Sequence, residues 1–124
     1  MSTIIASNIS DGTTSVASTY VVNGSAKAWV KVIYSSGVPS STGSFNISSI
    51  ADTGTGTYTS SFSSSFDNAD YSIGSQTTND RVGLVTCEQE THIQTASCRI
   101  TINDSRTASF NDWNSSVAFH GDLA

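Results

Sequence analysis

Two cysteines and a short acidic segment come closest, among the residues of this sequence, to a reactive site. Glu88, Glu90 and His92 follow Cys87 at alternate positions, and Cys98 comes shortly after them. Thiolate, carboxylate and imidazole groups can bind a metal ion or activate a nucleophile. Their spacing, however, matches no CxxC, HExxH or GxSxG motif. We therefore expect no catalytic residue, no metal site and no cofactor, and we assign these charges to a solvated hairpin tip.

The two cysteines fit a hairpin whose centre lies between His92 and Ile93. In that register Cys87 faces Cys98 across two antiparallel strands, close to the separation that a disulfide needs. One interpretation is a stabilising disulfide that forms in an oxidising medium. The other is a pair of reduced, buried thiols that act as small hydrophobic residues. Both interpretations predict that Cys87 and Cys98 are near neighbours.

Aromatic residues among polar neighbours are candidates for contacts with a glycan or another surface. Tyr71 follows the polar segment 67–70, and Trp113 lies in "FNDWNSS". An aromatic ring offers a sugar a flat apolar face, and neighbouring amides can bond its hydroxyls. The alternative, which we favour for Trp113, is packing against the core or a subunit interface. Segments 67–70 and 79–82 carry oxygen ligands that calcium accepts, but ordinary turns explain them better.

The clearest strand pattern, over residues 26–34, has apolar side chains on both of its faces. Alternation places Ala28 and Val30 on one face, and Trp29 and Ile33 on the other beside two lysines. An indole and a branched aliphatic side chain are unfavourable on a strand face that is exposed to water. We therefore expect Trp29 and Ile33 to form an interface, covered by a neighbouring subunit or by the N-terminal segment.

The elements that must position these residues are strands in one domain of 124 residues. Ser and Thr make up about a third of the chain, and Leu84 and Leu123 are its two leucines. Only 12% of the residues are charged, with a net charge of −5, which argues against nucleic-acid and anionic-membrane binding. No segment reaches the roughly 18 apolar residues of a membrane span. The first residues also lack the pattern of a signal peptide, so we expect a protein folded in the cytoplasm where it is made.

Short candidate strands recur between turns rich in Gly, Asn, Asp and Ser. They cover residues 18–22, 26–34, 44–50, 56–62, 70–76, 82–89, 93–102, 107–110 and 115–120. This spacing predicts an all-β fold, an antiparallel β-sandwich or jelly-roll-like domain of about eight or nine strands. Residues 1–17 are predicted to be an N-terminal arm or docking segment, and residues 18–124 a single β domain. Its few large aliphatic residues make a thin core, which favours oligomerisation.

Four segments of the chain resemble a small domain that recurs in tailed bacteriophages. They are "NGSAKAWV" at 23–30, "SFNISSIADTGTGTY" at 44–58, residues 62–71, and "VAFHGDL" at 117–123. That domain is usually described as a tail-fibre or virion structural protein. The resemblance covers about two thirds of the chain, from Tyr20 onward, and leaves residues 76–112 free to vary.

The resemblance implies a non-enzymatic virion structural protein of the tail-fibre type, exposed on the particle, with host-surface recognition as a further role. It also implies a homotrimer, whose partners are its own copies, other tail or capsid proteins, and a host cell-surface glycan. The expected location is the virion, after synthesis in the host cytoplasm. Because only residues 1–17 precede the domain, a capsid decoration protein is the alternative, and a glycan-degrading tail enzyme is less favoured.

Overall fold

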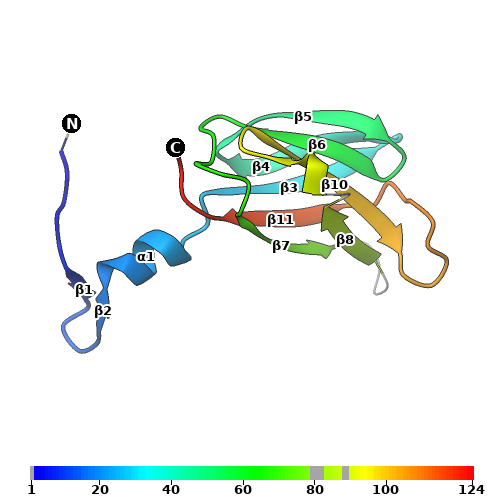
Figure 1. Ribbon diagram of the computed structural model, residues 1–124. Helices are drawn as coiled ribbons and strands as arrows, with labels where there is room; N and C mark the ends of the chain where they lie inside the picture. The colour runs from blue at the N-terminus through cyan, green and yellow to red at the C-terminus, as the bar shows by residue number, and fades with distance from the viewer. Residues whose placement is uncertain (1, 79–82, 88–89) are drawn as a thin grey trace.

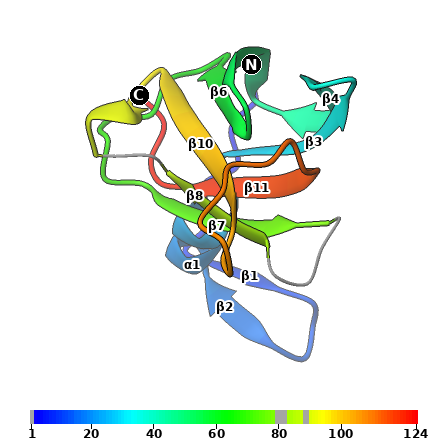
Figure 2. The same ribbon diagram turned by 90° about the vertical axis from the view of Figure 1, so that its right-hand side faces the viewer.

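The computed structural model describes residues 2–78, 83–87 and 90–124, and it confirms the all-β prediction. Two antiparallel sheets pack against each other as a sandwich, which we call the body (Figure 1). A short N-terminal segment projects from one end of the body. Figure 2, turned by 90°, places the hairpin of this segment below the two sheets.

The first sheet, which carries Trp29, has four strands. Their order across the sheet is β4 (Val38–Phe45), β3 (Ala28–Ser35), β11 (Ser115–His120) and β7 (Ser72–Thr77). A two-residue turn joins β3 to β4, with positive φ at both Ser36 (53°) and Gly37 (80°). Such turns match the right-handed twist of the strands they connect.

The second sheet carries both cysteines. Its order is β5 (Ile47–Gly54), β6 (Thr57–Phe62), β10 (Ser97–Asp104) and β8 (Gly83–Cys87), and β9 (Ile93–Gln94) also pairs with β10. A short 3₁₀ helix, η1 (Glu90–His92), precedes β9.

The core lies between the two sheets and is formed mainly by alternate residues of β3, β6, β10 and β11, with Phe66 and Tyr71 from the chain between β6 and β7. It contains Ala28, Val30, Val32, Tyr58, Phe62, Phe66, Tyr71, Val85, Cys98, Ile100, Ile102, Val117 and Phe119. Phe62 lies edge-on to Phe119 with ring centroids 5.1 Å apart, which joins the two sheets by an aromatic contact. A buried hydrogen bond of 2.9 Å between Tyr58 and Ser115 also crosses the core.

The predicted strand 44–50 is wrong, because the chain passes from one sheet to the other at Asn46. This residue has a φ of 56°, and β4 ends before it while β5 begins after it. Its side-chain amide donates to the carbonyl oxygens of Lys27 and Ser64, at 3.1 and 3.0 Å, and its Oδ1 accepts from the Ser64 backbone N–H at 2.7 Å. Asn tolerates this left-handed conformation better than other side chains do, so Asn46 fixes the corner.

The N-terminal segment contains β1 (Asn8–Ser10), β2 (Ser15–Ala17) and α1 (Ser18–Gly24). We call residues 2–24 the arm. The strand predicted at 18–22 is wrong, because these residues form α1. Their β-branched and aromatic side chains favour a strand only when a neighbouring strand packs against them, and α1 lies outside both sheets.

The prediction of a strand at 107–110 is also wrong. The chain there makes a turn, and only Phe110 bridges to Asn103. In the described part of the chain, no helix has the length and apolar character to cross a bilayer.

Candidate interaction surface

The outer face of the first sheet has a step in side-chain height beside Trp29. The indole in β3 lies between Phe45 of β4 and Ala118 of β11, and Ala118 in turn pairs with Gly74 of β7. The row across the sheet therefore runs from two aromatic rings to a methyl group and then to bare backbone. This loss of side-chain volume leaves a depression next to the ring.

That depression, which we call the Trp29 hollow, has a volume of about 520 Å³. The next row across the sheet lines it with Lys31, Ser116 and Gln76, which pair with one another in the ladders. The hollow thus has an apolar floor and wall with a few polar groups at one side. The hollow is open to solvent, and its exposed apolar lining makes it a candidate contact surface.

The indole of Trp29 is held at the wall of the hollow by the strand beside it. A β-carbon added to Gly43 of β4 would lie 3.6 Å from Cζ3 of Trp29, so the ring rests against this glycine. Trp29 is nevertheless 43% exposed, and Phe45 is exposed as well. Ile33 is half-buried on the same outer face, further along β3. The second apolar face exists, and its coverage by a neighbour stays a prediction.

The arm is the second uncovered apolar surface. Its large apolar side chains are all exposed: Ile4, Ile5, Ile9, Val16, Tyr20, Val21 and Val22. Ile4 and Ile5 are 93% and 95% exposed, and α1 has no buried residue. An apolar segment of this kind stands in water at a free-energy cost unless another surface covers it.

The joint between the arm and the body is held by several polar contacts. The Ser25 backbone N–H donates to the Val21 carbonyl at 3.2 Å. The Lys27 ammonium donates to the carbonyl oxygens of Val22 and Ser25, and His120 Nδ1 lies 3.2 Å from the Gly24 carbonyl. These contacts fix the direction in which the arm leaves β3.

The two cysteines are neighbours, as predicted, but not in the predicted register. Their sulfur atoms lie 2.8 Å apart, and both are free thiols. Cys87 pairs with Ile100 in the β8–β10 ladder, whereas Cys98 pairs with Ile93 of β9. The register differs because η1 interrupts the chain between β8 and β9, so the two sulfurs meet diagonally.

The environment makes the two thiols unequal. The pKa of the Cys98 thiol is raised, first by its hydrogen bond to Cys87 and then by burial. The pKa of Cys87 is lowered, because the same hydrogen bond stabilises its thiolate. Cys87 is also half-buried while Cys98 is fully buried. Cys87 is therefore the more reactive thiol of the pair.

Tyr71 and Trp113, the two candidates for a glycan or surface contact, both pack against the core. Tyr71 is 7% exposed, lies 4.4 Å from Phe66 between ring centroids, and donates its hydroxyl to the Gln94 carbonyl at 3.0 Å. Its ring is thus not available to a glycan at the surface. Trp113 is half-buried and packs against the core, as the favoured interpretation predicted.

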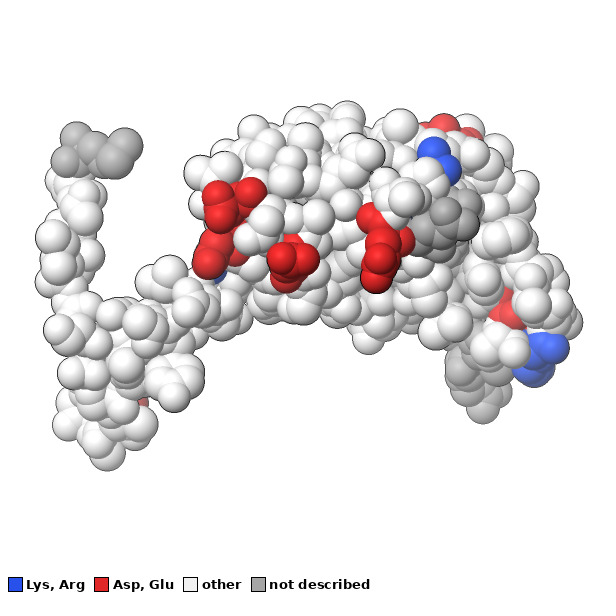
Figure 3. All heavy atoms as spheres, viewed as in Figure 1, with Lys and Arg blue, Asp and Glu red and all other residues white. Residues whose placement is uncertain are grey.

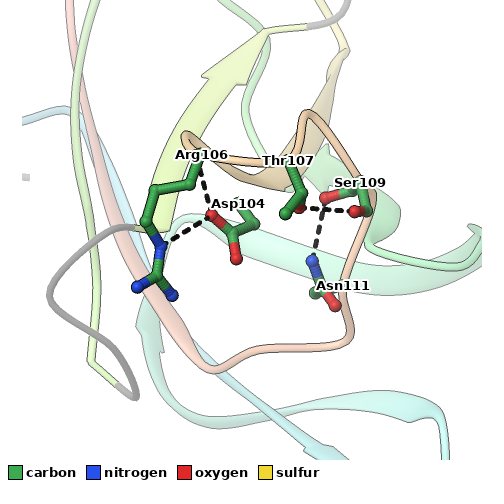
Figure 4. A network of polar contacts seen from close by, with 5 residues as sticks. All are labelled: Asp104, Arg106, Thr107, Ser109 and Asn111. Atoms are coloured by element: carbon green, nitrogen blue, oxygen red, sulfur yellow. Dashed lines mark hydrogen bonds and ion pairs between the residues drawn. The ribbon is translucent and has the colours of Figure 1, made fainter.

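The turn after β10 contains a polar network that serves the fold (Figure 4). Asp104 accepts the Arg106 backbone N–H at 2.8 Å and forms an ion pair of 3.6 Å with its guanidinium. The Arg106 backbone N–H is the main cause that holds the pKa of Asp104 below its usual value. In the same turn the Thr107 hydroxyl bonds the Ser109 hydroxyl, and the Asn111 side-chain amide donates to the Ser109 carbonyl oxygen. With its carboxylate engaged in this way, Asp104 closes a turn.

Metal ligands do not cluster in the described part of the chain, where no group of three or more His, Cys, Asp or Glu side chains could hold an ion. Segment 67–70 contains an ordinary turn, in which Asn68 Oδ1 accepts the Asp70 backbone N–H at 2.9 Å. Segment 79–82 and Glu88 lie outside the described residues. Figure 3 shows several acidic side chains across the middle of one face of the body, separated from one another by uncharged residues.

Comparisons of this chain with protein-family models, with curated proteins and with solved structures found no match.

Proposed function

We propose that this chain is a non-enzymatic structural subunit of a bacteriophage particle, of the tail-fibre type, exposed on the virion. The observation that carries the proposal is the arm, which presents seven large apolar side chains to water. A subunit of an assembly needs a folded body and an exposed apolar segment with which it can bind a neighbour. The body has its own buried core, and the arm is the segment that would bind a neighbour in the particle. The sequence resemblance supplies the kind of particle.

The same proposal includes self-association as a homotrimer, with Trp29 and Ile33 at or near the contact between copies. The exposed indole and Phe45 support an interface on this face of the first sheet. The net charge of −5 opposes nucleic-acid binding and favours solubility of an exposed particle protein. A host glycan remains a proposed ligand of the particle surface, to be sought at positions other than Tyr71.

The arm also favours the second candidate, a capsid decoration protein that stabilises the phage head. A decoration protein needs a docking segment and a compact body that rests on the shell. The arm and the sandwich provide these two parts. A glycan-degrading tail enzyme is the weakest of the three, because hydrolysis requires two carboxylates on either side of a sugar-binding cleft. The Trp29 hollow has Lys31 as its charged lining residue.

The test is to locate the chain on phage particles from its source. Antibodies to the purified protein would label particles for electron microscopy, and quantitative mass spectrometry would give its copy number relative to the major capsid protein. Label at the tail with a low copy number supports the tail-fibre type. Label over the head, in a number close to that of the capsid subunit, supports a decoration protein. Absence from purified particles overturns both.

A further inference from the structure

One chain contains two apolar surfaces that are both uncovered, the arm and the Trp29 hollow. We propose that the arm of one copy docks in the Trp29 hollow of a second copy, so that neighbouring subunits exchange arms. This inference rests on the proposed assembly role of the arm and names its partner, a second copy of this chain.

The chemistry of the two surfaces is complementary. The hollow offers the exposed indole of Trp29 beside Ala118 and the bare backbone of Gly74, with about 520 Å³ to fill. The tip of the arm offers Ile4 and Ile5, almost fully exposed on a segment without regular structure. Branched aliphatic side chains against an indole remove apolar area from water on both partners, which is the main driving force of association.

The joint explains why the partner is another copy. Folding the arm back onto its own body would break the Lys27 ammonium's bond to the Val22 carbonyl. It would also separate His120 from the Gly24 carbonyl. Figure 1 shows the arm leaving the body at the end where β3 begins and extending away from both sheets. An arm held in this direction presents its tip to a neighbour.

Charge favours the exchange as well. The arm carries a single charged residue, Asp11, although the chain has a net charge of −5. Two acidic bodies repel each other, whereas a nearly neutral arm can cross the space between them at little electrostatic cost. Lys31 at the side of the hollow is favourable for an arm whose one charge is negative.

The geometry of exchange also determines the kind of assembly. Each copy donates one arm and receives one: two copies that exchange arms reciprocally form a two-fold dimer, whereas arms passed to the next copy in turn make heterologous contacts. Heterologous contacts close into a ring when the rotation between copies is a simple fraction of a full turn. The proposed trimer is one such ring. A standard interface buries about 800 Å² on each partner, so the exposed side chains of the arm other than Ile4 and Ile5 must contact the neighbour outside the hollow.

The first experiment measures the mass of the full-length protein in solution by analytical ultracentrifugation. Gly74→Trp would fill the hollow, and the structure has open space there, because a β-carbon at Gly74 meets nothing within 4 Å. Ile5→Asp would make the tip polar without touching the body. Each change should weaken self-association at least tenfold. Val38→Trp, at an exposed position of β4 outside the hollow, is the matched control and should leave self-association unchanged.

The second experiment identifies the contact. A photo-crosslinking amino acid at Ile5, in an equal mixture of chains with normal and heavy isotopes, should link the arm of one copy to β3, β11 or β7 of another. Crosslinks within one chain, a monomeric unmutated protein, or an oligomer that neither Gly74→Trp nor Ile5→Asp weakens would overturn the proposal. The proposed function is tested separately on phage particles, so it can fail while arm exchange stands, and the reverse.

Discussion

Tyr58 in the body and Tyr20 in the arm show how differently the two regions use the same residue. Tyr58 is fully buried, and its hydroxyl is bonded to Ser115 across the core. Tyr20 is 73% exposed on α1. The body therefore encloses a core of buried apolar side chains, although Trp29 and Phe45 stay exposed on its outer face, whereas the arm buries none of its large apolar side chains. The buried contacts of the body therefore stabilise the fold, to which the exposed side chains of the arm contribute little.

This comparison predicts that removing a large core ring is the most damaging change to the fold. Phe119→Ala should lower the free energy of unfolding by about 3–5 kcal/mol, because it removes a fully buried ring from the contact between the sheets. Tyr20→Ala, the matched change in the arm, should alter the free energy of unfolding of a single subunit by less than about 0.5 kcal/mol. Chemical denaturation under dilute conditions measures both. Equal losses would contradict the division between body and arm.

The next largest effect concerns the turn between β5 and β6. Gly56 has a φ of 63°, and a β-carbon there would lie 2.6 Å from the Asn111 backbone nitrogen and 2.7 Å from the Ile102 carbonyl oxygen. Gly56→Ala should therefore cost about 2–4 kcal/mol, from backbone strain and displaced backbone. Gly74→Ala, with open space around it, is the control and should be nearly neutral. Thermal unfolding of the two variants separates these outcomes, and a neutral Gly56→Ala would show that the turn is not tightly packed.

A smaller effect is expected from oxidation of the cysteine pair. Oxidised glutathione should accept two electrons from the two thiols, forming a Cys87–Cys98 disulfide and two molecules of reduced glutathione. The closed loop should stabilise the body by about 2–3 kcal/mol. Intact mass, with a loss of two hydrogen atoms, and denaturation measure the two effects. Cys87→Ser is the control.

Cleavage of the arm by a protease should proceed at the same rate in the oxidised and reduced proteins, because the disulfide joins strands of the body.

The prediction of a disulfide would be contradicted if both thiols could still be alkylated after treatment with oxidised glutathione.

The smallest effect is the pH dependence of two turns. Backbone N–H groups lower the pKa of Asp104 in the body and of Asp11 in the arm. A carboxyl group whose pKa is lower in the folded state stabilises the fold at pH values above its ordinary pKa. This stability is lost as the pH falls through the lowered pKa. Asp104→Asn should therefore flatten the fall in unfolding free energy in acid. Asp11→Asn should leave this fall unchanged, because the turn that contains Asp11 lies outside the body. Denaturation of the two variants over a series of pH values compares their unfolding free energies.

The sequence predicted the strands whose two sides meet different surroundings. Alternation was sufficient for β3, β6 and β11, because one side of each faces the core and the other faces solvent. It missed β4, which contains Pro39 and several serines and is an edge strand, where burial imposes no clear pattern. It also misassigned residues 18–22 as a strand. Their β propensity does not decide between strand and helix, because no neighbouring strand packs against them.

The candidate surface was half predictable for a related reason. Trp29 was identified because it breaks the pattern of a solvated face within one strand. The hollow beside it depends on Ala118 and Gly74, which are far apart in the chain and meet only through the pairing of β11 with β7. The cysteine register was missed by two residues because η1 inserts chain that a simple hairpin does not contain.

The attachment of the arm to β3 has a mechanical consequence. β3 lies between β4 and β11, and its ladder hydrogen bonds run perpendicular to the strand. Tension applied through the arm therefore pulls along β3 and loads these bonds together in shear, whereas a pull across an edge strand would open them one at a time like a zipper. A chain pulled through its arm therefore resists the force until several ladder bonds of β3 break together.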